Sequence, residues 1–177
     1  MAVREIILFS EHEATLRDKS KAVPFVNQKV RRLIRDLKDT LEASSDGIGL
    51  AAPQINIHKR VVLVCPGDEM NGEWHSGLPV ALINPEIFEA SGERRDFDGC
   101  LSFPGLYGET TRPHHIRVTG LDEDGVPFDR IYEGFNAVVV HHEIDHLNGV
   151  LFIDRIENPQ DLYTLRKNEY GETVRVP

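Results

Sequence analysis

Five consecutive residues have the spacing of a metal-binding helical motif. They are His142-Glu143-Ile144-Asp145-His146, which is an H-E-x-x-H pattern. Residues four apart lie on one face of a helix, so both imidazoles can reach one metal ion while Glu143 lies beside it as a proton acceptor. Structural histidines are the alternative, and the pattern favours a metal site over them.

A catalytic metal of this kind needs a third protein ligand. A metzincin would supply a third histidine at position 152, where this sequence has Phe152, so that class is excluded. Cys100 lies in a glycine-flanked turn and is favoured as a thiolate ligand over Glu157, which lies in a turn-like Glu-Asn-Pro segment. A structural free thiol remains the alternative for Cys100. Cys65 lies in an apolar run and is expected in the core.

A glycine-rich segment, Gly47 to Gln54 (GIGLAAPQ), precedes the first expected strand. It follows a helix and lacks a third glycine, so it is a weak candidate for dinucleotide binding. We interpret it as an extended loop at the site. Gly47 and Gly49 would let another backbone approach closely, and Gln54 would offer an amide donor to a developing oxyanion. A plain connection with a surface glutamine is the alternative.

Periodicity predicts the elements that position these residues. Apolar residues repeat with helical spacing from Pro24 to Ala43, and a second, buried helix is expected after Gly134, ending at Asn148-Gly149. The expected strands are Arg60–Cys65, Val80–Asn84, residues 86–97, an Asp-Gly hairpin of Ile116–Leu121 with Phe128–Tyr132, and the terminal TVRVP. The prediction is one α+β domain over residues 1–177, with antiparallel sheets packed around the helix that carries His142 and His146.

Composition excludes several functional classes. Twenty Lys and Arg against 29 Asp and Glu leave a net charge of −9, which disfavours direct nucleic-acid readout. The longest apolar run, Val61–Cys65, is far too short to span a membrane, and the N-terminus lacks a signal-peptide pattern, so a cytoplasmic location is expected. The stretch Lys19–Lys38 holds seven basic residues and one acid, Asp36, which indicates either a solvated helix face or a docking surface for an anionic partner.

Three segments together closely resemble the signature motifs of the peptide deformylase family in order and spacing. They are Gly47–Gln54, Gly99–Ser102 and His142–Gly149, and the resemblance extends over roughly residues 4 to 155. It implies that Cys100, His142 and His146 are the metal ligands and that Glu143 is the acid/base. It also implies that Gln54 and the backbone N–H of Leu101 stabilise the oxyanion.

The resemblance further implies what the protein acts on. The substrates would be N-formyl-methionyl nascent peptides, cleaved to formate and a free N-terminus, with Fe²⁺ as the working metal and Zn²⁺ or Ni²⁺ able to occupy the site. Ile48 and Gly49 would pair with the peptide backbone as a strand edge. The residues expected to contact the substrate are Ile48, Gly49, Gly99, Phe135, Val138 and Val139. A transient ribosome contact is also expected, although the sequence predicts a strand at TVRVP where some members have the terminal helix used for this contact.

Two residues depart from the family pattern. Asp98 replaces a glutamate and is one methylene shorter, so its pairing with Arg112 is expected to be water-bridged or displaced. His141 replaces a glutamine and points about 100° away from His142 around the helix, which favours a supporting or packing role and a pKa near 6.5. Three hypotheses therefore stand: an active deformylase, a related hydrolase retuned to another small N-acyl group, and a metal-binding or ribosome-docking protein without catalysis.

Overall fold

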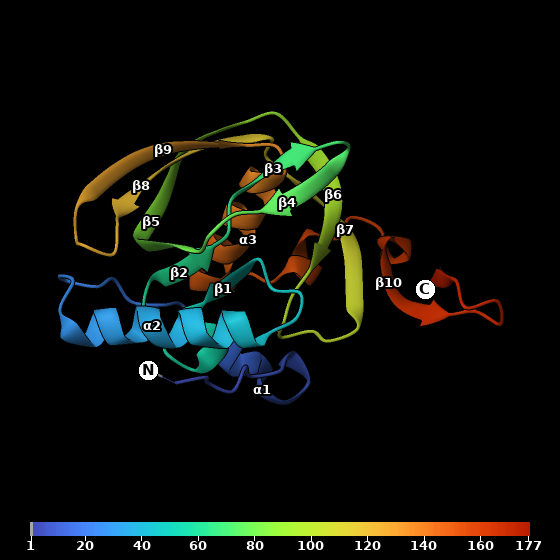
Figure 1. The fold of residues 1–177 in the computed structure, drawn as a ribbon, viewed down its shortest axis with the longest axis horizontal. Helices are drawn as coiled ribbons and strands as arrows, with labels where there is room; N and C mark the ends of the chain where they lie inside the picture. The colour runs from blue at the N-terminus through green and yellow to red at the C-terminus, as the bar shows by residue number, and fades with distance from the viewer. Residues whose placement is uncertain (1) are drawn as a thin grey trace.

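Two antiparallel sheets enclose one central helix in the computed structural model, which describes residues 2–177 (Figure 1). The larger sheet has the order β1 (Gly49–Ala51), β2 (Val61–Val64), β5 (Val80–Ser91), β8 (His115–Leu121) and β9 (Pro127–Glu133). The second sheet has the order β11 (Thr173–Val176), β10 (Leu162–Lys167), β7 (Leu106–Arg112) and β6 (Arg94–Gly99). A separate hairpin pairs β3 (Gly67–Met70) with β4 (Glu73–Ser76). The predicted α+β class is confirmed.

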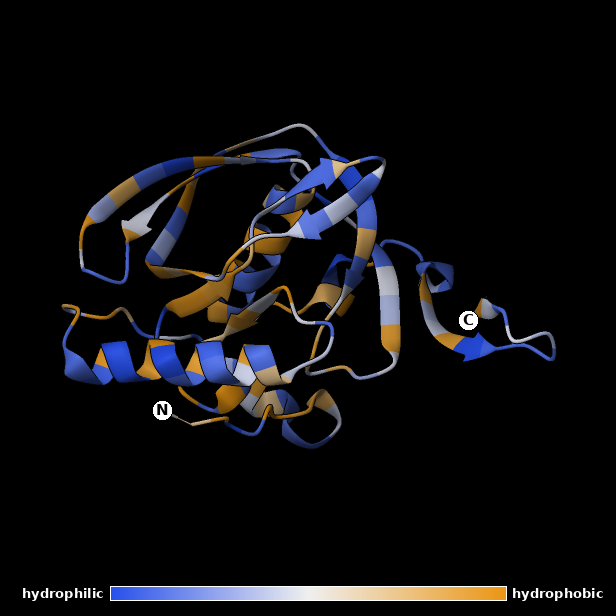
Figure 2. Ribbon diagram, in the orientation of Figure 1, coloured by the Kyte–Doolittle hydropathy of each residue, from blue (hydrophilic) through white to orange (hydrophobic). Residues whose placement is uncertain are grey.

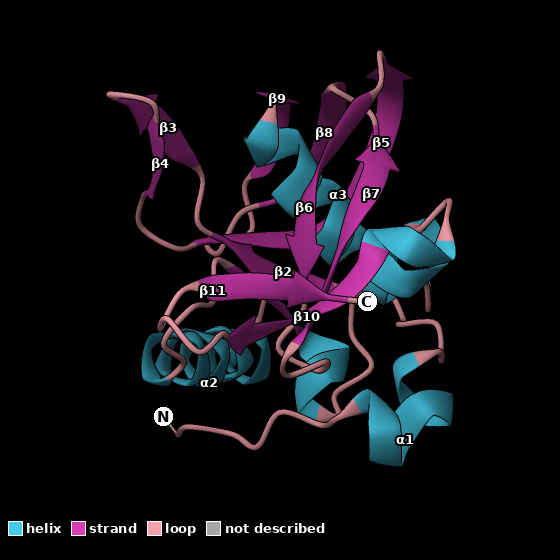
Figure 3. Ribbon diagram, turned by 90° about the vertical axis from the view of Figure 1, so that its right-hand side faces the viewer, coloured by secondary structure: helices cyan, strands magenta, loops and turns pink. Residues whose placement is uncertain are grey.

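The central helix, α3 (Phe135–Leu147), contacts strands of both larger sheets (Figure 3). Most of its residues are buried, including the β-branched Val138, Val139 and Val140, which are poor helix formers unless packing compensates. Gly134 precedes the helix with φ of 62° and Gly149 follows it with φ of 72°, so glycines at both ends accommodate backbone that other residues rarely adopt. The helix predicted after Gly134 is therefore confirmed.

The amphipathic helix α2 (Gln28–Ala43) covers one side of the larger sheet, and its apolar stripe is visible in Figure 2. Five buried apolar residues face the sheet: Val30, Leu33, Ile34, Leu37 and Leu41. Burying one such side chain fully stabilises the fold by about 1.5–3 kcal/mol. The predicted start at Pro24 is wrong, because Asn27 caps the helix by accepting a hydrogen bond from Val30 N at 3.1 Å.

Several elements differ from the sequence-based prediction. A single strand was expected over residues 86–97, but the chain turns at Gly92, with φ of 69°, between β5 and β6. The helix α1 (Phe9–Leu16) and the strands β3, β4, β7 and β10 were not predicted. The hairpin of β8 with β9 and the terminal strand β11 are confirmed.

No helix among residues 2–177 is long and apolar enough to cross a membrane. Cys65 is buried in the apolar cluster between α2 and the larger sheet, as predicted.

Candidate active site

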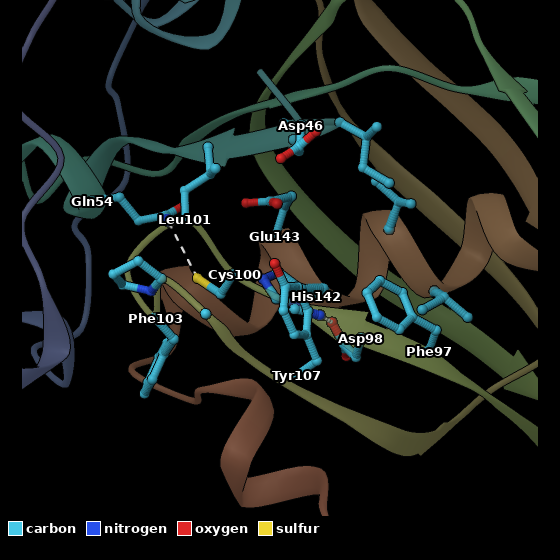
Figure 4. A pocket seen from close by; sticks show the side chains of 18 of the residues that line it. Asp46, Gln54, Phe97, Asp98, Cys100, Leu101, Phe103, Tyr107, His142 and Glu143 are labelled. Atoms are coloured by element: carbon cyan, nitrogen blue, oxygen red, sulfur yellow. Dashed lines mark hydrogen bonds and ion pairs between the residues drawn. The ribbon is translucent and has the colours of Figure 1, made fainter. Parts of the chain in front are cut away.

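A cavity of about 510 Å³ opens between β1, β6 and the first half of α3 (Figure 4). Twelve of the predicted site residues line it: Ile48, Gly49, Gln54, Asp98, Gly99, Cys100, Leu101, Phe135, Val138, Val139, His142 and Glu143. The other three, Arg112, His141 and His146, lie outside this lining. The three motifs, although far apart in sequence, therefore meet at one cavity.

Cys100, His142 and His146 form a cluster that could hold a metal ion. One potential ligand atom from each lies within 4.8 Å of the other two, and Cys100 Sγ is 3.3 Å from His146 Nε2. A thiolate and two imidazoles are a donor set that zinc and ferrous iron accept. Glu157, the alternative third ligand, does not belong to this cluster. The fold thus brings Cys100 next to the two histidines.

Asp98 orients His142 within this cluster. Its Oδ1 lies 2.8 Å from His142 Nδ1, and because an ionised carboxylate only accepts hydrogen bonds, Nδ1 carries the proton. Nε2 is then free to bind a metal, an arrangement common at metal sites. Burial opposes ionisation of Asp98, but its interactions with His142 and Arg112 outweigh this effect and hold the pKa of Asp98 well below its usual range.

A fully buried guanidinium, Arg112, links the two carboxylates that support the site. Its Nε donates to Asp98 Oδ2 at 3.0 Å, and its Nη1 donates to Asp145 Oδ2 at 2.8 Å. Thr110 also donates to Asp98 Oδ2. The expectation that Asp98 and Arg112 would be water-bridged or displaced is therefore wrong. Strands β6 and β7 pair along their lengths, which brings the shorter carboxylate close enough for direct contact.

His141 lies outside the cavity lining and contacts Arg112, in agreement with the supporting role expected from its position on the helix. Its Nδ1 accepts a hydrogen bond from Arg112 Nη1 at 2.7 Å. Burial lowers the pKa of His141 to about 4, although the charge of Asp145 opposes this shift and that of Arg112 reinforces it. The expected pKa near 6.5 is thus wrong, and the imidazole is neutral at pH 7. Its neighbours on β7 could not be seen from the sequence.

Replacing Arg112 with methionine should unfold the protein more readily than replacing an exposed arginine. Removal of Arg112 leaves Asp98 and Asp145 buried without a shared cation, so we expect a loss of about 3–5 kcal/mol in the free energy of unfolding. Arg117→Met is the matched control, because Arg117 is partly exposed and pairs with Asp129 at the surface; its cost should be at most about 1 kcal/mol. Chemical denaturation measures both. Equal losses would contradict the role given to Arg112.

Glu143 lies beside the metal cluster on the same helix. It is buried, its Oε2 has no hydrogen-bond partner among the described residues, and burial raises the pKa of Glu143 to about 7. A carboxylate with a pKa near the working pH suits proton transfer in both directions. A Cβ at Gly49 would lie 2.5 Å from Glu143 Oε1, so the missing side chain makes room for this carboxylate. The sequence had suggested that it would make room for another backbone.

Gln54 is held with its amide group directed into the site. It lies in a 3₁₀ helix, Ala52–Ile55, that follows β1, so the predicted extended loop is wrong in detail. Its Oε1 accepts from Ala51 N at 2.9 Å, and its Nε2 lies 3.1 Å from Ser102 Oγ and 3.4 Å from Cys100 Sγ (dashed line in Figure 4). Gln54 is 1% exposed, so the alternative that this residue is a surface glutamine in a plain connection is wrong. Leu101 lines the same cavity.

Sequence reasoning missed several residues of the site. Asp145 lies inside the H-E-x-x-H segment, so its proximity to the site could have been inferred, but its pairing with Arg112 could not. Ser102 is buried against Gln54. Gly47, which the sequence placed in a loop at the site, also lines the cavity, and the remaining lining residues that were not predicted are Asp46, Phe97, Phe103, Pro104, Gly105, Tyr107 and Leu165. No local pattern marks them, because separate loops and strands bring them together.

Comparisons with known proteins identify the family. The polypeptide deformylase family model matches residues 3–161. A peptide deformylase of Thermomicrobium roseum is 46% identical over 162 residues, which are 92% of this chain and 90% of that protein. The chain belongs to the polypeptide deformylase family. It is therefore a metal-dependent hydrolase that removes the N-formyl group from newly made peptides.

Solved structures agree with this assignment. The peptide deformylase of Ehrlichia chaffeensis in complex with actinonin superposes with a TM-score of 0.80 at 34% identity, covering 91% of this chain and 92% of that chain. The class I type b peptide deformylase of Acinetobacter baumannii with Met-Ala-Ser bound gives a TM-score of 0.79 at 31% identity, covering 88% of this chain and 99% of that chain.

Proposed function

We propose that Cys100, His142 and His146 hold one divalent metal ion at the catalytic site. The observation that carries this proposal is the clustering of one sulfur and two imidazole donors at the cavity, with His142 oriented by Asp98. Fe²⁺ is the working metal in this proposal, and Zn²⁺ or Ni²⁺ can take the same position. Such an ion lowers the pKa of water and acts as a Lewis acid toward a carbonyl.

The substrate binds as an extended strand between two sheet edges. β1 is the outer strand of the larger sheet and β6 that of the second sheet, and Gly49 and Gly99 of these strands line the cavity. An extended peptide can form backbone hydrogen bonds with such edges. The methionine side chain then enters the apolar part of the cavity, which is lined by Ile48, Phe135, Val138 and Val139.

The chain's own residues carry the proton and the developing charge. Glu143 accepts the proton of the attacking water, whose oxygen joins the formyl carbon. Gln54 Nε2 and the backbone N–H of Leu101 donate hydrogen bonds to the oxyanion that forms on the formyl oxygen. The formyl C–N bond then breaks, and Glu143 returns the proton to the departing amine. The products are formate and a peptide with a free N-terminal amine.

Gln54→Ala should lower kcat by about 10²- to 10³-fold, because it removes one oxyanion donor while leaving the metal cluster in place. KM for the peptide should change far less, since Gln54 would interact most strongly with the transition state. Steady-state formate release measures both constants. Gln160→Ala is the matched control, because Gln160 is exposed and outside the cavity lining. An unchanged kcat in Gln54→Ala would remove Gln54 from the mechanism.

One experiment tests the proposed function as a whole. Protein purified without oxygen is assayed for metal content and for release of formate or acetate from formyl-Met-Ala-Ser and acetyl-Met-Ala-Ser. We expect about one metal ion per chain and release of formate alone. Acetate release without formate would favour a hydrolase retuned to another acyl group. Bound metal with neither product would favour a metal-binding protein without catalysis.

Cellular context completes the proposal. We infer that residues 1–177 act as one catalytic domain in the cytoplasm, where nascent chains are made, with transient contact to the ribosome. Arg31, Arg35 and Lys38 of α2 line a depression together with Glu123 and Asp124, and Lys38 Nζ lies 2.7 Å from Glu123 Oε2. The basic residues of α2 are the feature that supports a contact with an anionic partner. The segment after residue 161 folds into two strands rather than a terminal helix.

A further inference from the structure

The last two strands, β10 and β11, form a hairpin beside the candidate site. They begin at Leu162, after the residues that match the family model, which end at 161. β10 pairs with β7 through Leu162 with Gly108, Tyr163 with Tyr107 and Thr164 with Leu106. The hairpin therefore extends the second sheet (Figures 1 and 3).

Leu165 brings this hairpin into the cavity. It follows the last residue of β10 that pairs with β7, so it extends past the start of β7. Side chains two residues apart on a strand share a face, which places Leu165 on the same face as Tyr163 and its partner Tyr107. Leu165 lines the candidate cavity although it is 41% exposed.

Phe97, Tyr107 and Leu165 together form what we call the apolar ledge, on three neighbouring strands at the cavity. The rings of Phe97 and Tyr107 stack with centroids 5.4 Å apart. All three residues line the cavity, and Figure 4 shows Phe97 and Tyr107 near Asp98 and His142. Phe97 is 43% exposed, so two apolar side chains of the ledge remain open to a ligand. Apolar surface at the edge of a cavity is typical of a binding site.

Charged residues hold the hairpin against the sheet. The guanidinium of Arg175 lies 4.4 Å from the centre of the Tyr163 ring, and its Nη1 donates to Glu109 Oε1 at 2.9 Å. Arg95 also donates to Glu109, and it donates to Asp161, the residue before β10, at 2.6 Å. These contacts join β11 and the residue that precedes the hairpin to β6 and β7, so the position of Leu165 does not depend on strand pairing alone.

Strand geometry shows which substrate residue would meet the ledge. Asp98 contacts His142 of α3, so the face of β6 that carries Asp98 is turned toward α3. Phe97 is its neighbour along the strand and lies on the opposite face. A peptide paired with β6 alternates in the same way. If its methionine side chain points toward α3, the side chain of its second residue points toward the apolar ledge.

We propose that the C-terminal hairpin is part of the substrate site and that Leu165 favours an apolar second residue in the nascent peptide. This inference rests on the proposed function, because it requires the formylated methionine to lie at the metal cluster. The side chain after the methionine packs on Phe97, Tyr107 and Leu165. Apolar contact there lowers KM without taking part in bond breaking.

A peptide series tests this inference. The value of kcat/KM for formate release is measured for formyl-Met-Leu-Ser, formyl-Met-Ser-Leu and formyl-Met-Ser-Ser. We expect the first to exceed the third by about three- to tenfold, less than an enclosed pocket achieves, because the ledge is open on one side. In Leu165→Ala this preference should fall toward one, mainly through a higher KM for formyl-Met-Leu-Ser.

Val174→Ala is the matched control. Val174 lies on the same hairpin and is 37% exposed, but its partner in the register is Arg166, so it lies on the face opposite Leu165. This variant should keep the preference for leucine at the second position. An unchanged preference in Leu165→Ala, or a preference at the third position instead, would overturn the role of the hairpin. Absence of formate release from every peptide by the unmodified protein would overturn the proposed function, and this inference with it.

Discussion

Glu143→Ala should lower kcat for formate release by about 10²- to 10⁴-fold while the protein still binds its metal. Glu143 is adjacent in sequence to the proposed ligand His142, but it does not belong to the cluster of Cys100, His142 and His146. It can therefore be removed without removing a donor atom. The loss would reflect the missing proton acceptor.

Two measurements on the same samples separate chemistry from binding. Elemental analysis should give the same metal content for Glu143→Ala and for the unmodified protein, while steady-state assays show the fall in kcat. Glu157→Ala is the control, because Glu157 is exposed and lies outside the metal cluster. It should keep both metal and activity. An active Glu143→Ala enzyme would show that another group accepts the proton.

Cys100→Ser, His142→Ala and His146→Ala should each lose the metal and, with it, nearly all formate release. Three protein ligands hold a catalytic ion of this kind, so removing one of them both lowers the affinity for the metal and disrupts the coordination geometry. Samples should be prepared without oxygen, because a ferrous ion and a thiolate ligand are both open to oxidation.

The second cysteine provides the control for this set. Cys65 is buried in the apolar cluster beside α2, so Cys65→Ala should keep full metal content and activity even if the protein unfolds somewhat more readily. Full metal occupancy in Cys100→Ser would contradict the three-ligand assignment. Loss of metal in Cys65→Ala would show that metal content follows stability rather than ligation.

The elements that could be predicted are those with a strong local pattern. The helix of His142 and His146, the apolar stripe of α2 and the Asp-Gly hairpin of β8 and β9 each rest on a period or turn within about 20 residues. The helix α2 begins at Gln28 rather than at Pro24, because Asn27 caps it by accepting a hydrogen bond from Val30 N. The apolar pattern alone continues upstream of this cap. The hairpin of β3 and β4 escaped prediction because its residues are mostly exposed and polar.

The sequence predicted which residues form the site, but not which contacts these residues make with one another. The motifs indicated Cys100, Glu143 and Gln54, and all three line one cavity. Asp98 and Arg112 were expected to be water-bridged or displaced but pair directly, and the pKa of His141 is lower than the expected 6.5. Both depend on how β6 and β7 pair and on how α3 packs against them. The apolar ledge depends in addition on a hairpin whose own sequence is largely polar.

By itself, the sequence determined which chemical groups this protein can bring to a reaction. Two imidazoles and a carboxylate on one helical turn follow from residue spacing, because helix geometry is a local property. Only the tertiary structure decided that Cys100 reaches His146 across 46 residues and that Asp98 orients His142 across 44. Such contacts depend on sheet register, where a slip of one residue turns every side chain to the other face. Burial is also decided by the tertiary structure, and it raises the pKa of Glu143 to a value suited to proton transfer.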